Sequence, residues 1–528
     1  MLICKKTDGG VEMKIKRTIA LSAALLMLCS AILCGCTQES VESTPEVQVS
    51  SGGVRTEYID ENGNYYAKTS GKRYDGQSIS FLTCGSSSVF ESEILPNTVY
   101  YEEGAAQTYP QIINDDLNER AIQLEEQLGL KLEEVQFMSA TRKNGEMLQH
   151  IIQGNLSSTD EYQVVVPCLY DGASLATAGH LYNLRGLDGL QIDAPWWNAE
   201  FNESMTYGDQ LYFTIGDIGL VNKSCTSALF FNYDLWKKFG FNEKFGGSPY
   251  ELVRKGEWTI DILAEASKVM SDDLDDNGKI DYKDEFGWAG QLDDMWGFFF
   301  GAGERIASAD ADGYPTLTMY NQRSARVMDK IQNFVKNDEY YVSANDYFSV
   351  TPTPTELTRE AFITGRALFF NDALGTVTVL GDMEAHFGVV PEPKFEKSQD
   401  GYHSLVNPWG ASCFAIPTCV VGDALTMTVD ALNVLGAASK NTIAKDYQET
   451  VLSYMKTRDE ESAEMINEYI LPTRACDIGM VYQWGGLDVM LQNMAYYPVG
   501  SFASQYESLE TQAEAALERA IEFYKKNG

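Results

Sequence analysis

The chain is poor in the residue patterns that mark zinc sites and common hydrolases. It has four histidines in 528 residues, and the six cysteines after the N-terminal segment form no Cys-x-x-Cys pair. Zinc sites are built from clusters of these two residue types, so the sequence argues against one. Gly-x-Ser-x-Gly, His-Glu-x-x-His and phosphate-loop motifs are also missing, which argues against the enzyme classes that depend on them.

Positive charge is also scarce. The chain has 40 Lys and Arg against 76 Asp and Glu, a formal net charge of −36. A strongly acidic body repels nucleic acid and anionic lipid. This composition excludes a nucleic-acid partner and suits a surface protein that binds neutral solutes and metal cations.

Only one long apolar run is present, and it lies at the N-terminus. The basic stretch Met13-Lys-Ile-Lys-Arg17 precedes an apolar run from Ile19 to Leu33, which ends in Leu33-Cys34-Gly35-Cys36. This order predicts a signal peptide over 1–35 that starts at Met13. Its end resembles a bacterial lipobox, which implies lipidation of Cys36 and a lipid-anchored protein on the extracellular face of the cell membrane. A plain signal peptide or an uncleaved anchor is the alternative.

The next segment, 36–75, is rich in Ser, Glu, Gly, Asn and Thr and has few large aliphatic residues. Such a composition buries too little apolar surface to order itself, and it predicts a flexible linker. About 490 residues follow Cys36, enough for two or three domain-sized cores.

The first folded stretch alternates strands and helices. Apolar strands are expected at 79–83, 130–135 and 162–167, and a helix at 114–128 has Leu117, Ala121, Leu124 and Leu128 on one face. This alternation with short connections predicts an open, mostly parallel sheet with helices on both faces. Ligands of such sheets bind beyond the carboxyl ends of the strands.

An ordered set of short motifs continues along the chain. It runs through Val164-Val-Val-Pro, Leu211-Tyr-Phe-Thr-Ile-Gly-Asp, Leu229-Phe-Phe-Asn-Tyr-Asp-Leu-Trp, Gly256-Glu-Trp-Thr, Gly365-Arg-Ala-Leu-Phe-Phe-Asn, Phe387-Gly-Val-Val-Pro and Phe414-Ala-Ile-Pro. The set resembles the bacterial extracellular solute-binding lipoproteins of carbohydrate ABC importers, solute-binding protein family 1, of which maltodextrin-binding protein is a distant relative.

This resemblance implies an α/β, two-lobe, periplasmic-binding-protein-like (type II) fold with a cleft between the lobes. Lobe 1 is expected at 76–222 plus 410–470, and lobe 2 at 228–405 plus 475–528. By analogy, the chain crosses between lobes near 219–227, 404–411 and 471–475. Closure of the lobes around a solute would be a hinge motion.

The implied function is the substrate-binding subunit of an ABC importer. Such a monomer would bind a sugar or oligosaccharide between its lobes and deliver it to the permease without chemistry. A surface-anchored glycoside hydrolase is the main alternative, because such an enzyme needs only two suitably placed carboxylates. An adhesion or scaffold module is a third possibility.

One twelve-residue segment, 273–284, fits a calcium loop. Hard oxygen ligands recur at the required spacing, and Gly278 occupies the sharp turn at position six. The expected ligands are Asp273, Asp275, Asn277, Lys279 through its carbonyl, Asp281 and Asp284. The following Glu285-Phe-Gly-Trp-Ala is predicted to be a strand or loop, so the loop is expected to be an embedded structural calcium site. A solvated acidic turn is the alternative.

Sugar sites combine aromatic platforms with polar side chains that form hydrogen bonds. Residues of these types fall at predicted strand ends, crossings or loops, although each could equally serve packing. The candidates for contact with the solute are Trp409, Trp484, Trp196, Trp296, Tyr170, Asp217, Asp372 and Arg474.

Overall fold

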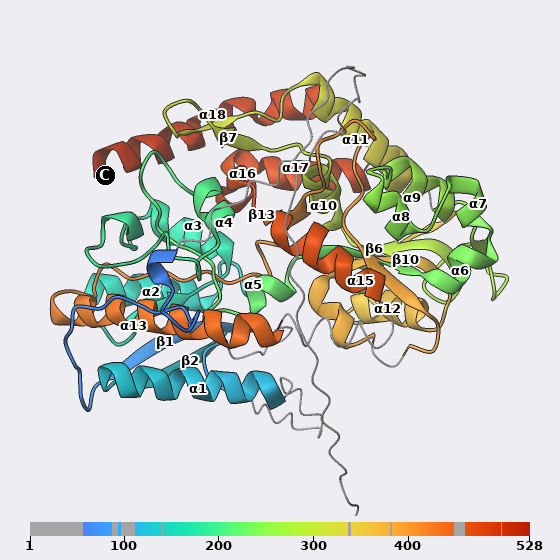
Figure 1. Cartoon of the computed structure of the whole chain (residues 1–528). Coiled ribbons are helices and arrows are strands. Elements are labelled where there is room, and N and C mark those ends of the chain that lie inside the picture. Colours follow the sequence, from blue (N-terminus) through green and yellow to red (C-terminus); the bar gives the residue numbers. More distant parts are fainter. Residues whose placement is uncertain are drawn as a thin grey trace, which may run out of the picture. The chain divides into compact units, whose positions relative to one another are not determined.

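The computed structural model describes residues 56–86, 93–96, 111–139, 141–335, 339–380, 383–447, 460–497 and 499–527 (Figure 1). The signal peptide over 1–35, its start at Met13 and the lipidation site Cys36 lie outside these ranges. Across the part of the chain that the structure describes, no helix combines the length and apolarity needed to cross a bilayer.

The first sheet is fully parallel, with strand order β2-β1-β3. Its strands are β1 (Ser78–Ser86), β2 (Lys131–Ser139) and β3 (Val164–Val166). Ser78 pairs with Lys131, and Phe81 pairs with Val164. The three valines of β3 are buried, as expected for a β-branched run at the centre of a covered sheet. Antiparallel bridges extend this sheet from β3 to 415 and from 414 to 214.

Helices cover this sheet and form lobe 1 with it. The main ones are α1 (Gln111–Leu128), α2 (Glu146–Ser157), α3 (Leu169–Thr177) and α13 (Asp423–Asn441). α1 and α13 pack against each other, and in the view of Figure 1 α1 is drawn below β1 and β2 and α13 above them. Leu117, Leu124 and Leu128 of α1 are buried, which confirms the predicted apolar face, and the helix begins three residues before the expected 114. Shorter elements of this lobe are η1 (Thr56–Tyr58), η2 (Leu184–Gly186), α4 (Ala199–Ser204) and α5 (Val221–Ser224).

The second sheet is mixed, with strand order β11-β4-β10-β6-β5, and β9 also pairs with β6. Its strands are β4 (Ser227–Asn232), β5 (Ser271–Asp272), β6 (Glu285–Gly290), β9 (Tyr341–Ser343), β10 (Ala367–Ala373) and β11 (Phe387–Val390). β10, β6 and β9 run parallel to one another, so their carboxyl ends share one edge.

The helices of lobe 2 pack around the second sheet. They are α6 (Tyr233–Lys238), α7 (Phe241–Phe245), α8 (Pro249–Arg254), α9 (Ile260–Ser267), α10 (Asp294–Gly301), α11 (Gln322–Val335), η3 (Ala344–Tyr347), α12 (Thr355–Ile363) and η4 (Leu374–Thr378). A hairpin of β7 (Ala307–Ala309) and β8 (Pro315–Leu317) lies apart from the sheet. The predicted strand or loop after 284 is strand β6.

The three segments expected to cross between the lobes lie next to one another. β12 (Ser404–Leu405) pairs in parallel with β13 (Arg474–Ala475). The Val406 amide donates to the Ala475 carbonyl at 2.9 Å, and the Asn407 amide donates to the Cys225 carbonyl at 2.9 Å. The segment at 404–407 is therefore the middle strand of a three-segment hinge.

The predicted flexible linker is wrong for its last twenty residues. The Tyr65 amide donates to Asn441 at 2.8 Å, and the Ser70 amide donates to Asp430 at 2.8 Å, both on α13. Tyr74 is buried, and its hydroxyl also donates to Asp430 at 2.8 Å. Composition alone did not predict this packing. The stretch is polar overall, and only a few tyrosines spaced along it hold it against lobe 1.

The expected lobe boundaries in the C-terminal third also need correction. Ala463, Ile466 and Ile470 share a buried cluster with the second sheet, so 460–470 belongs to lobe 2 and not to lobe 1. This stretch comprises α15 (Glu460–Glu464), the π-helix η5 (Met465–Ile470) and then η6 (Leu471–Thr473). Its place in lobe 2 rests on contacts with strands that lie far away along the chain, so the sequence did not show where the chain changes lobe.

The last helices pack on both cores and not on lobe 2 alone. They are α16 (Ile478–Tyr482), η7 (Trp484–Gly486), α17 (Leu487–Tyr496) and α18 (Phe502–Asn527). Near its start, α18 places Phe502 in the lobe 2 core, and near its end it places Tyr524 in the lobe 1 core. One amphipathic helix therefore contacts both lobes.

Candidate ligand site

Polar side chains gather in the segments that follow the parallel strands of both sheets. Lys143 follows β2, Tyr170 and Asp171 follow β3, and Asp293 follows β6. This is the edge at which open α/β sheets bind ligands, because the strand ends and helix starts there leave a crevice. The hinge segment at 404–410 reaches one of these groups, because Asn407 donates to Asp293 at 3.1 Å.

Arg142 joins lobe 1 to the hinge. Its guanidinium is buried and donates to the Cys84 carbonyl at 2.7 Å and to the Ser412 hydroxyl at 2.8 Å. Its Nε donates to the Trp409 carbonyl at 3.3 Å. The guanidinium of Arg142 therefore donates to protein groups. In this geometry it positions Trp409.

Asp293 joins lobe 2 to the same hinge. Its carboxylate accepts from Asn407 Nδ2 at 3.1 Å and from Gln492 Nε2 at 2.9 Å. Asn407 Oδ1 in turn accepts from the Trp409 amide at 2.9 Å. The half-buried Trp409 is thus held by lobe 1 through Arg142 and by lobe 2 through Asn407.

A cavity of about 370 Å³ opens beyond the carboxyl ends of β6 and β9. Its size falls in the range of small-molecule sites. Polar and aromatic side chains share its wall with apolar ones: Gln291, Leu292, Met295, Val335, Tyr341, Ser343, Asp346, Ala495 and Tyr496. Tyr341 is fixed in place by stacking on Trp288, with ring centroids 4.4 Å apart. The cavity can hold a sugar-sized molecule against rigid aromatic groups.

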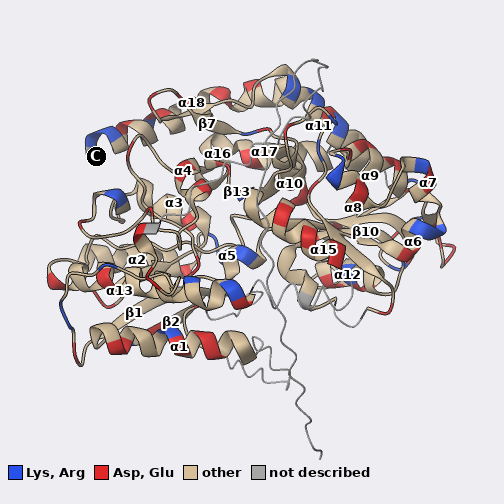
Figure 2. Cartoon of the chain, in the orientation of Figure 1, with Lys and Arg blue, Asp and Glu red and all other residues tan. Residues whose placement is uncertain are grey.

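The electrostatics of this region are acidic. Burial raises the pKa of Asp293 and of Asp488, and it raises the pKa of Asp171 to about 6. The cations nearby are Arg142 and Lys143, and Lys143 Nζ lies 4.5 Å from the centre of the Tyr170 ring. Figure 2 shows Asp and Glu positions along α1, α13, α15 and α18 as well. An anionic solute would meet mostly like charge here, whereas a neutral hydroxylated solute would meet hydrogen-bonding groups.

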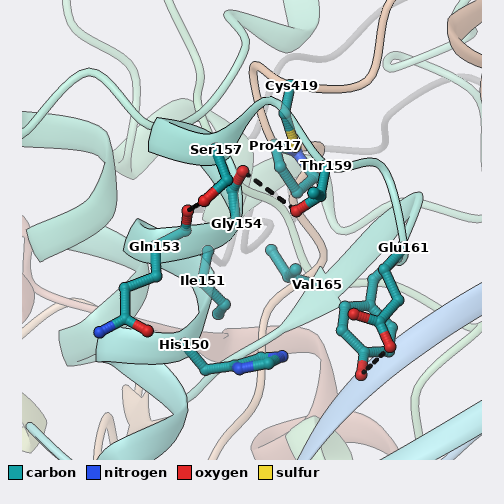
Figure 3. Close-up of a pocket in the computed structure, with 11 residues that line it drawn as sticks. His150, Ile151, Gln153, Gly154, Ser157, Thr159, Glu161, Val165, Pro417 and Cys419 are labelled. Atoms are coloured by element: carbon teal, nitrogen blue, oxygen red, sulfur yellow. Dashed lines mark hydrogen bonds between the residues drawn. The ribbon is translucent and has the colours of Figure 1, made fainter.

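A smaller cavity, of about 190 Å³, lies in lobe 1 between α2 and the segment that enters β3 (Figure 3). His150 lines it, and its ring lies 5.1 Å from that of Phe137 and 5.7 Å from that of Tyr162. The cavity opens beside 157–162, before β3 begins, and so not at the carboxyl edge where ligands of such sheets bind.

Three of the predicted tryptophans are core residues. Trp196 is fully buried, with Tyr58 edge-on at 5.4 Å. Trp484 is buried and stacks on Tyr482 at 5.5 Å, and Trp296 is buried and donates to the Asp488 carbonyl at 2.9 Å. Their packing leaves none of them a free aromatic face in this structure.

The predicted charged residues form ion pairs. Asp217 is buried, with Lys223 Nζ at 3.0 Å and Lys440 Nζ at 3.2 Å. The half-buried Arg474 lies close enough for Asp217 to raise its pKa, although burial has the larger effect and lowers it. Asp372 pairs with Arg359 at 3.1 Å and accepts from Thr376 at 2.8 Å.

Of the eight predicted residues, the structure brings Tyr170 and Trp409 to the junction of the lobes. Sequence reasoning missed their polar partners Lys143, Asp293, Asn407, Asp488 and Gln492. Their position along the sequence could have identified two of them. Lys143 and Asp293 each follow a strand of a parallel pair, and a polar residue at that point is a candidate for a ligand site.

The segment 273–284 forms the connection between β5 and β6. Asp273, Asp275 and Asp284 place carboxylate oxygens within 4.8 Å of one another. The Asp273 carboxylate accepts from the Gly278 amide at 2.7 Å, and Gly278 has a φ of +80°, which glycine adopts without strain. Three converging carboxylates on a tight loop are the donor set that calcium prefers, so the residues fit this ion.

Comparison with known proteins defines the fold. No protein-family model matches the chain, and no curated protein matches it. The solved structure of UgpB from Mycobacterium tuberculosis in complex with glycerophosphocholine is similar, with a TM-score of 0.50 and 14% identity over 77% of this chain and 96% of that one. A solute-binding protein from Thermotoga lettingae bound with α-D-tagatose has a TM-score of 0.49 and 13% identity, over 84% of this chain and 100% of that one. A cyclo/maltodextrin-binding protein complexed with maltotetraose has a TM-score of 0.49 and 13% identity, over 86% of this chain and 98% of that one. The first of these shows that the chain has the two-lobe α/β fold of extracellular solute-binding proteins, which confirms the expected fold class.

Proposed function

We propose that this chain is the substrate-binding subunit of an ABC importer, which holds a neutral sugar or oligosaccharide between its lobes and releases it unchanged. The observation that carries the proposal is the double attachment of Trp409. Arg142 of lobe 1 and the Asn407–Asp293 pair of the hinge and lobe 2 hold the backbone of the same residue, whose side chain is half-buried. A solute that packs on this indole contacts a group whose position depends on both lobes, so binding is coupled to closure.

The chemistry around Trp409 supports a carbohydrate. The half-buried Trp409 supplies aromatic surface, and the Asp293 carboxylate with the Asn407 and Gln492 amides supplies directional hydrogen-bonding groups. The cavity beyond β6 and β9 adds Tyr341 and Gln291. Sugars present both apolar C–H faces and hydroxyls, so such sites pair aromatic and polar side chains. The acidic surroundings favour a neutral solute over a phosphorylated or carboxylated one.

We infer from the N-terminal pattern that Cys36 is lipidated and that the protein faces the outside of the cell membrane. The partner would be the membrane permease, and the binding subunit would act as a monomer. Growth with labelled palmitate tests the anchor: label should appear in the wild-type protein and disappear in C36S.

We also propose a structural calcium ion in the loop 273–284. Asp273, Asp275, Asn277, Asp281 and Asp284 would supply side-chain oxygens, and Lys279 would supply its carbonyl. Bound calcium would neutralise the carboxylates that converge there and tie the start of β6 to the end of β5. Within lobe 2, that hairpin leads directly into the segment that carries Asp293.

A binding screen with a turnover control tests the main proposal. The purified protein is heated with maltotetraose, D-tagatose, ribitol or glycerophosphocholine, with and without calcium, and the melting temperature is recorded. A sugar that raises it is then incubated for a day and analysed by chromatography, while small-angle scattering records the radius of gyration. We expect stabilisation, compaction and intact sugar. Cleavage of the sugar, or binding by a rigid body without compaction, would overturn the proposal.

A further inference from the structure

The described residues that line the cavity beyond β6 and β9 all belong to the lobe 2 side. Gln291 directly follows β6, Val335 ends α11, and Ser343 ends β9. Ala495, near the end of α17, belongs to the same buried cluster as Val335. A group bound in this cavity therefore contacts lobe 2, whereas the residues that hold Trp409 come from both lobes.

The wall of the cavity is held in place by its own packing. The Tyr341 ring stacks on Trp288 with centroids 4.4 Å apart, and Trp288 stacks on Phe334 with centroids 4.6 Å apart. Gln291 Oε1 accepts from the Thr355 hydroxyl at 3.2 Å, which orients the amide. A ligand that meets fixed groups loses less free energy to the ordering of side chains. The cavity is thus preorganised for a ligand.

The chemistry of the wall matches a sugar ring. Tyr341 and Ser343 contribute hydroxyls, Gln291 contributes an amide, and Leu292 contributes apolar surface. Asp346 is exposed and is the one charged group among the described residues that line the cavity, so an anionic ligand would find no counter-charge there. A sugar ring presents hydroxyls around an apolar C–H face, and this wall can contact both.

The cavity adjoins the hinge through Asp293. This residue directly follows Leu292 of the cavity wall, so their Cα atoms are about 3.8 Å apart. The Asp293 carboxylate accepts from Asn407 at 3.1 Å, and Asn407 holds the Trp409 amide. None of these three hinge-side residues is among the described residues that line the cavity. A single ring that packs on Trp409 would therefore leave the cavity unfilled, whereas a second ring linked to it can enter.

We propose that this cavity is a subsite for a second sugar unit, and that the solute is an oligosaccharide and not a monosaccharide. One unit packs on Trp409 at the hinge. The next unit enters the cavity, where its hydroxyls form hydrogen bonds with Gln291 and Ser343 and its C–H face meets Leu292. This inference rests on the proposed function, and it names the class of sugar that the site selects.

The test compares sugars of different length. The Kd values of glucose, maltose, maltotetraose, cellobiose and cellotetraose are measured by calorimetry on the wild-type protein. A second unit that fills the cavity should lower the Kd of one disaccharide, and of its tetrasaccharide, at least about tenfold below that of glucose. A glucose Kd too weak to measure beside a measurable oligosaccharide meets this expectation.

Two variants remove parts of the cavity wall. Gln291 and Tyr496 are half-buried, so Q291A and Y496A should fold, and their melting temperatures without sugar check this. In each variant the Kd of the best-bound oligosaccharide should rise roughly 3- to 10-fold, while that of glucose should stay within twofold. The comparison of sugar lengths on the wild-type protein tests the subsite even where a variant melts several degrees lower.

Tyr320 provides a matched control. It is a tyrosine of lobe 2 that is 46% exposed, its ring stacks on Tyr506 with centroids 4.5 Å apart, and it is not among the described residues that line the cavity. Y320A should leave the Kd of the oligosaccharide and of glucose unchanged.

The outcomes separate this inference from the proposed function. If the wild-type protein binds glucose or D-tagatose as tightly as the oligosaccharides, or if folded Q291A and Y496A keep the oligosaccharide Kd within twofold, the subsite is wrong and the function stands. Equal losses for glucose and the oligosaccharide in these variants would place the first unit in the cavity and would also contradict the subsite. If the wild-type protein binds none of the sugars, both proposals are wrong.

Discussion

Glu392 should make the protein less stable as the pH rises toward neutral. It is fully buried, and its Oε1 accepts from the Ser227 hydroxyl and from Asn371 Nδ2 at 3.1 Å. Among the residues that the structure describes, its Oε2 has no hydrogen-bond partner and no cation pairs with the carboxylate. Burial therefore raises the pKa of Glu392 from 4.5 to about 7.

The direction of the pH effect on stability depends on whether the folded or the unfolded protein binds the proton more tightly. Between these two pKa values the folded protein keeps a proton that the unfolded chain releases, so rising pH favours unfolding. The stabilisation is fully present below pH 4.5 and is lost as the pH passes through 7. The difference between the two pKa values corresponds to about 3 kcal/mol. In E392Q the group cannot ionise, so this loss should disappear.

The assay is urea unfolding followed by tryptophan fluorescence at several values between pH 5 and pH 8. Between pH 5 and pH 8, the free energy of unfolding of E392Q should rise by up to about 3 kcal/mol relative to that of wild type. Glu304 is a matched control, because it is also buried but pairs with Arg323. E304Q should be less stable than wild type at pH 8. A difference between E392Q and wild type that stays constant with pH would refute the reasoning.

Four further predictions concern the hinge, the core, the site and the metal. D217N leaves the buried Lys223 and the half-buried Lys440 without their carboxylate and should lower the free energy of unfolding by about 3–5 kcal/mol at neutral pH. Because the pKa of Asp217 is lowered, the urea midpoints of wild type and D217N should converge as the pH falls below 4. G436A should cost about 1–3 kcal/mol in urea unfolding, since a Cβ there would lie 2.2 Å from an indole carbon. W409A should weaken the Kd of the selected sugar by about tenfold, whereas Y66A, at an exposed tyrosine, should not. Calcium should raise the melting temperature of wild type over that in EGTA, and D273N should abolish the difference.

Local pattern was sufficient to predict much of the fold. The valines of β3 and the apolar face of α1 each show their period within a short window, so their elements were predicted correctly. The helix expected at 114–128 nevertheless begins at Gln111. Element types thus follow from the sequence more safely than element ends.

The candidate site depends on contacts that no window contains. Asn407 lies 114 residues from Asp293, and Gln492 lies 199 residues from it. Trp196 shows the same difficulty in reverse: its exposure depends on Tyr58 and on the absence of a side chain at Gly436. An aromatic residue in a loop between predicted elements therefore has the same sequence signal whether it packs or binds.

The proposed calcium loop and the candidate ligand site differ in how far their residues are spread along the chain, although β6 adjoins both. Every expected ligand of the loop lies within twelve residues, so its spacing is visible in the sequence, whereas the site draws on both lobes. β6 joins them: the loop precedes Glu285, and the segment with Asp293 follows Gly290. Antiparallel pairing of Ser271 with Phe286 adds to the register that β9 and β10 give to β6, and a slip of one residue would turn Trp288 and its neighbours to the opposite face. The proposed ion would oppose that slip, so its removal should weaken sugar binding through the position of Asp293 without any contact between calcium and sugar.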